Sequence, residues 1–284
     1  MDLNRVMVTG AQGMIGRAMP WGIKLARSDL DVTNSNQIAS VFDAIRPSAV
    51  VHLAAMDIRQ CQTDPLTGYN VNTVGTYHVA VCARRASIPL LFVSTGAVFS
   101  GPLGSRFDES AAPCPVNFYG QSKLLAELLV RKTLGCEHLI VRTGWVYGAD
   151  GPHQRKFVNI AIDKALRGEP IQGSKDQEGS AIYVKDLVAQ IAGFLQSEAR
   201  GTYHVVNDGV VTGFSLARWI VQAVKSKSQV EGFDARQSSG NSIGRSPSEV
   251  LVSQKLRLRS WHEAINEYIA TVCGGKAGLA ASDF

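Results

Sequence analysis

The stretch FYGQSK, residues 118–123, places a phenol and an ammonium four residues apart, in Tyr119 and Lys123. Side chains with this spacing lie on one face of a helix, where they can meet. A cation beside a phenol stabilises the phenolate, so such a pair is suited to moving protons. The same spacing also arises by chance on solvated helices, and the rest of the chain must decide between the two interpretations.

Three glycines, Gly10, Gly13 and Gly16, follow the β-rich stretch VMVT and open a helical stretch. A loop of this kind turns tightly, lets backbone N–H groups approach a pyrophosphate and packs a helix against a strand. The spacing is G-x-x-G-x-x-G rather than the commoner G-x-G-x-x-G, and a plain glycine-rich turn is the alternative. The position between a strand and a helix favours dinucleotide binding.

The segment after the glycine loop is short. Pro20 closely follows Gly16, so we expect a short first helix, and the next strand-like run, IKLAR, is minimal. The acidic or basic residue that reads the ribose at the end of this strand is therefore hard to place. Arg17 and Arg27 are the nearest cations, and either could hold the 2′-phosphate of NADP. A solvated surface arginine is the equal alternative for each.

The first half of the chain alternates strand-like runs with amphipathic helical stretches. The runs cover residues 5–10, 48–55, 90–99 and 136–148, and the helical stretches cover residues 35–46, 72–86 and 122–134. This alternation predicts an α/β fold built on a Rossmann-type doubly wound parallel sheet, with helices on both faces.

Beyond residue 150 the pattern loosens. A helix with loop flanks is expected within residues 151–170, a Gly/Ser-rich loop at 237–249 and a final helix at 260–272. We therefore expect residues 1–150 to form the dinucleotide-binding domain, residues 151–272 mainly a smaller C-terminal substrate-binding lobe interleaved with it, and residues 273–284 a flexible tail.

The composition excludes several classes of protein. No apolar run approaches the length of a membrane span, and the N-terminus lacks the pattern of a signal peptide, so we expect a cytoplasmic protein. The five cysteines form no CxxC pair and the histidines show no metal-ligand spacing, which argues against a disulfide framework or a metal site. The net charge of +5 is not clustered with aromatic residues, so no nucleic-acid partner is expected.

A series of motifs then carries a family resemblance: the glycine loop, LDVTN, VVHLAA, NTVGT, VSTGAVFSG, FYGQSK and VRTGWVYG, in this order. The chain resembles the extended short-chain dehydrogenase/reductases, and within them the dTDP-4-dehydrorhamnose reductase family. The resemblance continues through KDQEGSAIYVKDLV, GTYHVVNDGVVTGFSLARWI and RSPSEVLVSQKL to about residue 272. Each motif alone is weak, but their order and spacing are specific.

The resemblance implies catalytic roles. Tyr119 would be the general acid that protonates a carbonyl oxygen as hydride arrives, and Lys123 would stabilise its phenolate and bind the nicotinamide ribose. Thr95 would hydrogen-bond the substrate oxygen. Ser94 is the alternative, but side chains alternate along a strand and Ser94 is expected to point into the sheet. Asn72 would steady the helix that carries the tyrosine and hold a water molecule.

The resemblance also implies a dinucleotide cofactor, with NADP(H) favoured and NAD(H) as the other option. The residues that we expect around the cofactor are Gly10, Gln12, Gly13, Met14, Ile15, Gly16, Arg17, Asp31, Val32, Leu53, Ala54, Ala55, Tyr119, Lys123 and Arg142.

The substrate side is expected around Thr95, Trp145, Asp176 and Gln177. Trp145 follows the fourth strong strand, where the family lines its sugar pocket, although a core tryptophan is an equal alternative. Asp176 and Gln177 lie in KDQEGS, which matches a loop that closes on the nucleotide sugar; a polar turn is the other interpretation. Arg155 and Lys156 could meet a diphosphate.

One departure from the family bears on the reaction. This chain has Gly96 and Ala97 where the reductases often have an acid and an aromatic residue, and where nucleotide-sugar dehydratases have an Asp-Glu pair. Without that pair, water elimination is disfavoured, and reduction or epimerisation stays open.

The leading hypothesis is NAD(P)H-dependent reduction of a 4-keto-6-deoxy nucleotide sugar by an enzyme that could form a homodimer. The alternatives are a nucleotide-sugar epimerase with bound NAD and an NADP-binding regulatory subunit that resembles the methionine adenosyltransferase β subunit.

Overall fold

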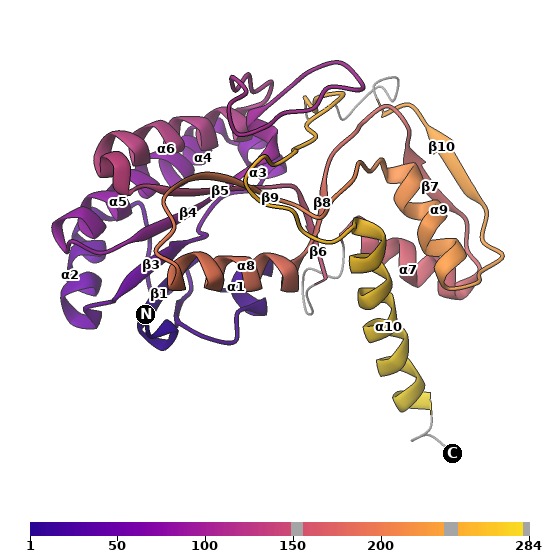
Figure 1. The fold of residues 1–284 in the computed structure, drawn as a ribbon, viewed down its shortest axis with the longest axis horizontal. Coiled ribbons are helices and arrows are strands. Elements are labelled where there is room, and N and C mark those ends of the chain that lie inside the picture. Colours follow the sequence, from indigo (N-terminus) through magenta and orange to yellow (C-terminus); the bar gives the residue numbers. More distant parts are fainter. Residues whose placement is uncertain (149–155, 236–243, 281–284) are drawn as a thin grey trace.

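A computed structural model describes residues 1–148, 156–235 and 244–280, with the backbone alone for residues 274–280. Its main body contains a six-stranded sheet in which all neighbouring strands are parallel, in the order β2-β1-β3-β4-β5-β9 (Figure 1). The predicted Rossmann-type parallel sheet is thus confirmed. The strands are β1 (Val6–Thr9), β2 (Ile23–Leu25), β3 (Ala49–His52), β4 (Leu90–Thr95), β5 (Leu139–Thr143) and β9 (Gly201–Val205).

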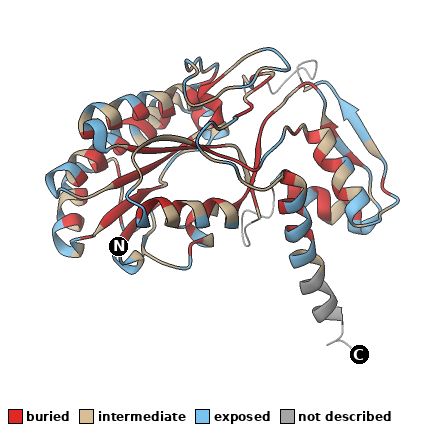
Figure 2. Cartoon of the chain, viewed as in Figure 1, coloured by how far each residue is buried: buried red, intermediate tan, exposed pale blue. Residues whose placement is uncertain are grey.

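Both faces of this sheet are covered, because its strands are apolar on both sides (Figure 2). Met7 and Phe92 pack toward a core with α2 (Ser35–Ile45), α5 (Thr76–Arg85) and α6 (Phe118–Leu134). Val8 and Val93 pack toward the opposite core, which includes α8 (Val184–Gln196).

From β1 the chain goes to β2 on one side and then crosses to β3 on the other side, so the strand order reverses between β1 and β3. In doubly wound sheets, ligands bind in the crevice outside the carboxyl ends of the strands at such a switch point. The glycine loop lies there, between β1 and α1 (Met14–Ala18). As predicted, α1 and β2 are short, with five and three residues.

A smaller lobe lies beside the main body and closes the other side of this crevice (Figure 1). It pairs β7 (Ile171–Ser174) with β10 (Val230–Phe233), and both strands pack against α9 (Gly213–Ala223). The helix α7 (Phe157–Arg167) packs against α9 and β7. Two further short strands, β6 (Trp145–Tyr147) and β8 (Ala181–Tyr183), pair with each other between the two parts. The chain passes between the parts more than once, since α8 and β9 belong to the main body. The domain boundaries themselves stay a prediction.

Shorter elements connect these strands and helices. They are η1 (Leu3–Arg5), α3 (Ile58–Thr63), α4 (Pro65–Tyr69), the π-helix η2 (Asn70–Gly75), η3 (Gly96–Val98) and η4 (Gly135–Glu137). No helix within the described part of the chain is both long and apolar enough to cross a membrane.

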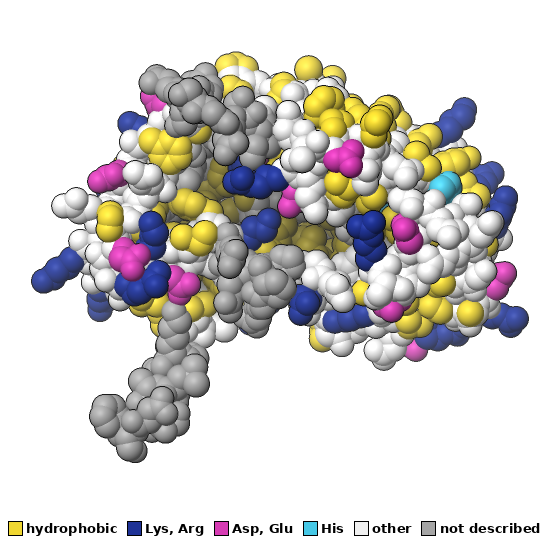
Figure 3. Space-filling view, turned by 180° about the vertical axis from the view of Figure 1, so that it is seen from behind, with side chains coloured by type: hydrophobic (Ala, Val, Ile, Leu, Met, Phe, Trp, Pro, Cys, Tyr) yellow, Lys and Arg dark blue, Asp and Glu magenta, His cyan; other side chains and the backbone are white. Residues whose placement is uncertain are grey.

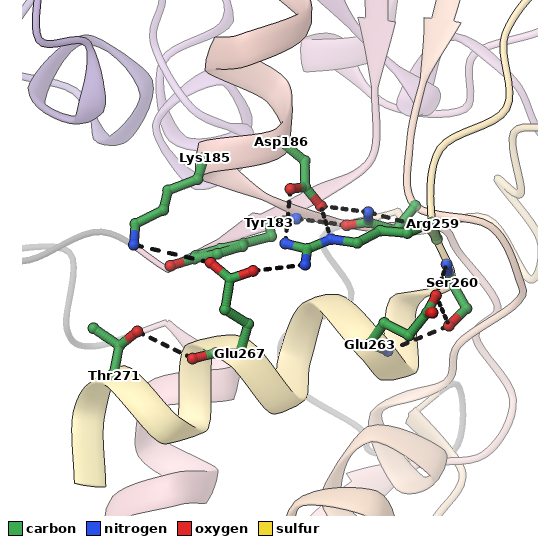
Figure 4. A network of polar contacts seen from close by, with 9 residues as sticks. Tyr183, Lys185, Asp186, Arg259, Ser260, Glu263, Glu267 and Thr271 are labelled. Carbon is green, nitrogen blue, oxygen red and sulfur yellow. Dashed lines mark hydrogen bonds and ion pairs between the residues drawn. The ribbon is translucent and has the colours of Figure 1, made fainter. Parts of the chain in front are cut away.

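The last helix, α10 (Trp261–Ala280), is held by a charged network (Figure 4). Arg259 donates two hydrogen bonds to Asp186 at the start of α8, at 2.8 and 2.9 Å, and one to Glu267 of α10, at 2.6 Å. Lys185 adds an ion pair to Glu267 at 4.0 Å.

The helix α10 extends to Ala280, well beyond the expected end near residue 272, so the segment expected as a tail begins as helix. Residues 281–284 lie outside the described part.

Candidate active site

A cavity of about 680 Å³ lies between the carboxyl ends of the main sheet and the smaller lobe. This volume is in the range of small-molecule and cofactor sites. Figure 3 shows the surface hollowed between the two parts, with hydrophobic side chains in the hollow and Lys and Arg side chains around it. This one cavity is lined by the glycine loop, by Thr95 and Tyr119, and by residues of α7, α9, β7 and β10. The other two catalytic candidates, Asn72 and Lys123, are buried and lie outside its lining.

The glycine loop forms one wall of the cavity. Gly10 has φ = 66°, and a Cβ there would lie 2.6 Å from the backbone nitrogen of Ala54, so only glycine fits. A Cβ on Gly16 would lie 2.6 Å from Ala11 Cα. Both glycines let the loop lie close against its neighbours.

Gly13 has a different role, because it is the N-cap of α1 and faces the cavity. A Cβ on Gly13 would meet only the carbonyl oxygen of Gly10 within 4 Å, at 3.2 Å, and no side chain caps the helix. The first N–H groups of a helix have no intrahelical acceptor, so those of Met14 and Ile15, which also line the cavity, are available to an anion. This cradle fits a dinucleotide pyrophosphate.

The other cofactor candidates divide into two groups. Leu53 lines the cavity, and the backbone of Ala54 supports Gly10. Arg17 is exposed and donates a hydrogen bond to the carbonyl oxygen of Gln12 at 2.9 Å. Asp31 accepts hydrogen bonds from Thr33, which hold the pKa of its carboxyl below the usual range. The structure leaves these residues outside the cavity lining: Gln12, Arg17, Asp31, Val32, Ala54 and Ala55.

Tyr119 and Thr95 meet in the cavity because α6 approaches the end of β4 closely. A Cβ on Gly120 would lie 2.1 Å from the carbonyl oxygen of Ala97, so the glycine is what permits this approach. Asn117 caps the helix by accepting a hydrogen bond from the Gly120 N–H at 2.8 Å. The helix start is therefore fixed just where the phenol must reach the hydroxyl.

Burial raises the pKa of Tyr119 to about 12, although its hydrogen bond with Thr95 acts in the opposite direction. The phenol is therefore fully protonated at neutral pH, as a proton donor must be. Loss of water around the half-buried phenol outweighs the effect of the hydrogen bond with Thr95. The stabilisation of the phenolate by Lys123 stays a prediction.

Lys123 is buried, with 2% of its surface exposed. Its Nζ donates a hydrogen bond to the carbonyl oxygen of Val93 at 2.8 Å and lies 4.1 Å from the centroid of the Phe92 ring. Burial lowers the pKa of Lys123 to about 7, with the carboxylate of Glu127 acting in the opposite direction. The lysine thus lies one helical turn from Tyr119 with a charge that is easily lost or gained near neutral pH.

Asn72 holds the helix turn between the two residues. Its Oδ1 accepts a hydrogen bond from the Met56 N–H at 2.7 Å, and its Nδ2 donates to Ser122 Oγ at 3.0 Å. The hydroxyl of Thr73 donates to the carbonyl oxygen of Ser122 at 2.8 Å. The π-helix η2 therefore fastens α6 through Ser122, which lies between Tyr119 and Lys123. The water expected at Asn72 stays a prediction.

Ser94 and Arg142 face away from the cavity. Ser94 donates a hydrogen bond to Glu127 at 2.6 Å, so its neighbour Thr95 is the hydroxyl that lines the cavity. Arg142 is buried in an ion pair with the same Glu127, with Nη2 2.7 Å from Oε2. The expected contact of Arg142 with the cofactor is therefore wrong, because the strand directs this side chain toward α6.

The substrate candidates are also divided. Trp145, Gln177 and Lys156 line the cavity. Asp176 is 4% exposed, and its Oδ1 accepts a hydrogen bond from the Ala235 N–H at 2.8 Å, so it stabilises a loop rather than facing the substrate. Arg155 lies outside the described residues.

Sequence reasoning missed several charged residues of the cavity lining: Asp57, Arg59, Arg245 and Glu249. Glu249 is the most notable, because its Oε1 accepts a hydrogen bond from Trp145 Nε1 at 2.5 Å. Burial raises the pKa of Glu249, while Trp145 and Arg245 act in the opposite direction. No signal in the Gly/Ser-rich stretch around it pointed to chemistry. Among the described residues, no group of three or more His, Cys, Asp or Glu side chains could hold a metal ion.

The fold and the site together define a class. The features of a short-chain dehydrogenase/reductase are a doubly wound parallel sheet, a glycine loop at its switch point, and a Thr-Tyr pair in the cavity with a buried lysine one helical turn from the tyrosine. Comparison with known families then identifies the branch: residues 4–273 match the model of the RmlD substrate binding domain, and the chain belongs to this family. The resemblance inferred from the motifs is thereby confirmed.

Individual relatives agree with this assignment. The chain is 34% identical over 224 residues to a dTDP-4-keto-6-deoxy-D-glucose reductase of Streptomyces niveus, covering 76% of this chain and 77% of the relative. It is 28% identical to the spore coat polysaccharide biosynthesis protein SpsK of Bacillus subtilis, over 94% of this chain and 97% of the relative.

A solved structure supports the same conclusion. The crystal structure of dTDP-4-dehydrorhamnose reductase from Bacillus anthracis in complex with NADP matches with a TM-score of 0.85 and 29% identity. The match covers 94% of this chain and 98% of the crystallised chain. The similarity thus includes both the main body and the smaller lobe.

Proposed function

We propose that this protein reduces the C4 carbonyl of a 4-keto-6-deoxy nucleotide sugar with NAD(P)H. The observation that carries the proposal is the hydrogen-bonded pair of Tyr119 and Thr95, which lines the same cavity as the glycine loop. The names of the relatives supply the substrate class, since they include reductases of two dTDP-4-keto-sugars.

The residues divide the work as follows. The glycine loop would hold the pyrophosphate of the dinucleotide, which when bound supplies the hydride. Tyr119 would donate its phenolic proton to the oxygen of the substrate carbonyl, and Thr95 would hydrogen-bond that same oxygen. Two donors on one oxygen stabilise the negative charge that develops there during reduction.

The charges of the cavity fit an anionic substrate. Arg59, Lys156 and Arg245 line it and are exposed, so they can reach the diphosphate of a nucleotide sugar. Reduction is favoured over dehydration because no acid-base pair directly follows Thr95: η3 begins with Gly96 and Ala97. The finer parts of the proposal are NADP(H) as the preferred dinucleotide, a cytoplasmic location, no nucleic-acid partner and a homodimer. Analytical ultracentrifugation would report the mass of the homodimer in solution.

The test is turnover of a panel of 4-keto nucleotide sugars, measured by loss of NADPH or NADH absorbance. Tyr119→Phe should lower kcat by about 10²–10⁴-fold, which is the usual contribution of general acid catalysis. NADPH affinity should survive, and Tyr77→Phe, which changes an exposed tyrosine of α5, should leave turnover unchanged. A Tyr119→Phe protein with wild-type turnover would rule out the mechanism.

The same panel separates the alternatives. An epimerase would be purified with NAD bound and would convert a nucleotide sugar without added reductant. A regulatory subunit would bind NADPH and leave every keto-sugar of the panel unchanged.

A further inference from the structure

The carboxylate of Glu249 occupies a position in the cavity that the proposed reaction does not use. The proposed catalytic steps need only proton donors at the carbonyl oxygen, and Thr95 and Tyr119 supply them. An ionised carboxylate is an acceptor only, and it would repel that oxygen. A glutamate in this cavity therefore requires a different partner.

Glu249 is held firmly by its surroundings. Its backbone N–H donates a hydrogen bond to the carbonyl oxygen of Glu178 at 3.1 Å, and its Oε1 accepts one from Trp145 Nε1 at 2.5 Å. The neighbouring Ser248 bonds through its backbone to Gly101, and Val250 accepts from the Phe107 N–H at 2.9 Å. The segment thus runs between two loops, which fix where the side chain points.

One oxygen of the carboxylate stays available. Trp145 occupies Oε1, and no described residue donates a hydrogen bond to Oε2. Because Glu249 lines the cavity, this second oxygen is open to a ligand. Glu249 is half-buried, and an acceptor that is partly removed from water gains from a ligand that brings a donor.

The position of Glu249 relative to the reacting carbon follows from two observations. A Cβ on Gly96, the residue directly after Thr95, would lie 3.0 Å from the carbonyl oxygen of Glu249. In addition, the charge of Glu249 contributes to the raised pKa of Tyr119. Glu249 therefore lies beside the place where a carbonyl would accept its proton, and the small residue at position 96 makes room for its chain segment.

We propose that Glu249 determines substrate specificity by accepting a hydrogen bond from the hydroxyl on C3 of the sugar, the ring carbon next to the keto carbon. This inference rests on the proposed function, because it places a C4 carbonyl at Tyr119. Of the two ring carbons beside C4 in a 4-keto-6-deoxy sugar, C3 carries a hydroxyl donor and C5 carries a methyl group. The carboxylate thus selects sugars with a hydroxyl at C3 and disfavours 3-deoxy sugars, which leave it unpaired.

The experiment measures binding, so it does not depend on turnover. Calorimetry would compare a dTDP-linked 6-deoxyhexose that carries the C3 hydroxyl with its 3-deoxy counterpart, in the presence of NADP⁺. The wild type should bind the hydroxylated sugar about 10- to 100-fold more tightly, the usual effect of one hydrogen bond to a charged group. Glu249→Leu should bind both sugars equally, and Glu249→Gln should keep a smaller preference, because a neutral amide bonds more weakly.

Two controls make the result decisive. Glu178→Gln removes a neighbouring carboxylate that is paired with Arg106 at 3.1 Å, outside the cavity lining, and should keep the full preference. Unchanged NADPH affinity in the Glu249 variants would show that they are folded. The assignment of Glu249 is wrong if Glu249→Leu and Glu249→Gln keep the wild-type ratio of the two affinities. This includes the case in which both affinities fall by the same factor.

The wild type by itself separates this inference from the proposed function. A wild type that binds both sugars with equal affinity refutes only the role of Glu249. A wild type that binds neither sugar and turns over no keto-sugar of the panel refutes the proposed function, and the specificity role falls with it.

Discussion

Lys123→Met should make the cofactor-free protein more stable at neutral pH and less stable in alkali. The pKa of Lys123 is lowered from 10.5 to about 7 by burial. Between these values the unfolded chain binds a proton that the folded chain does not, so the stability of the wild type rises with pH. Each pH unit is worth about 1.4 kcal/mol, and burial of the lysine therefore costs about 4 kcal/mol at pH 7.

The opposing effect is the lost hydrogen bond. In the variant, the carbonyl oxygen of Val93 loses the donor that lies 2.8 Å away, at a cost of about 1–3 kcal/mol. The cost of burying the lysine exceeds this loss at pH 7 and falls below it above about pH 9. We therefore expect Lys123→Met to be more stable than the wild type by about 1–3 kcal/mol at pH 7, with the two stabilities crossing near pH 9.

The assay is urea unfolding at pH 6, 7, 8, 9 and 10, followed by circular dichroism. Lys132→Met is the matched control, because Lys132 is an exposed lysine of the same helix and its loss should leave the pH profile parallel to that of the wild type. Parallel profiles for Lys123→Met and the wild type would refute the reasoning, as would a variant that is less stable at pH 7.

Other changes test other parts of the molecule. Gly13→Val should abolish NADPH binding in a folded protein, because the added side chain enters the cavity at the start of α1; unchanged calorimetric affinity would contradict the pyrophosphate site. Arg17→Ala or Arg27→Ala should lower the NADPH/NADH affinity ratio by about 10- to 100-fold, and a ratio unchanged in both would remove the basis for an NADP preference. Thr95→Val should reduce kcat less than Tyr119→Phe does, which steady-state kinetics on one keto-sugar can compare. Arg259→Ala should destabilise the fold by about 1–2 kcal/mol in urea at low salt and less at high salt, since it removes the ion pairs that hold α10.

Local patterns in the sequence were sufficient for the fold and for half of the site. Strands β1 to β5 of the main sheet were predicted because apolar runs bounded by turn residues are visible without any knowledge of tertiary contacts; β9, β7 and β10 were not. The short α1 and β2 followed from Pro20 and its neighbours. Tyr119 and Thr95 were placed together because both match motifs of the family that the chain resembles.

The remainder depended on contacts that no local pattern reveals. Arg142 was wrongly assigned to the cofactor because its ion pair with Glu127 joins a strand to a helix and cannot be seen in the sequence. The raised pKa of Tyr119 and the lowered pKa of Lys123 are consequences of burial, which is a property of the assembled fold. Glu249 enters the cavity from a segment more than a hundred residues beyond Tyr119, in a stretch with no regular periodicity.

The position of β9 has a consequence for synthesis on the ribosome. This strand closes the sheet by pairing with β5, and it does not exist as chain until residue 205 has been made. Until then, the edge of β5 that later pairs with β9 has no partner, although every residue of this strand is buried in the finished fold. The sheet face that α8 later covers is also open. Exposed edges of this kind are templates for aggregation. The nascent chain therefore has to keep a nearly complete sheet from pairing with other chains while about sixty further residues are translated.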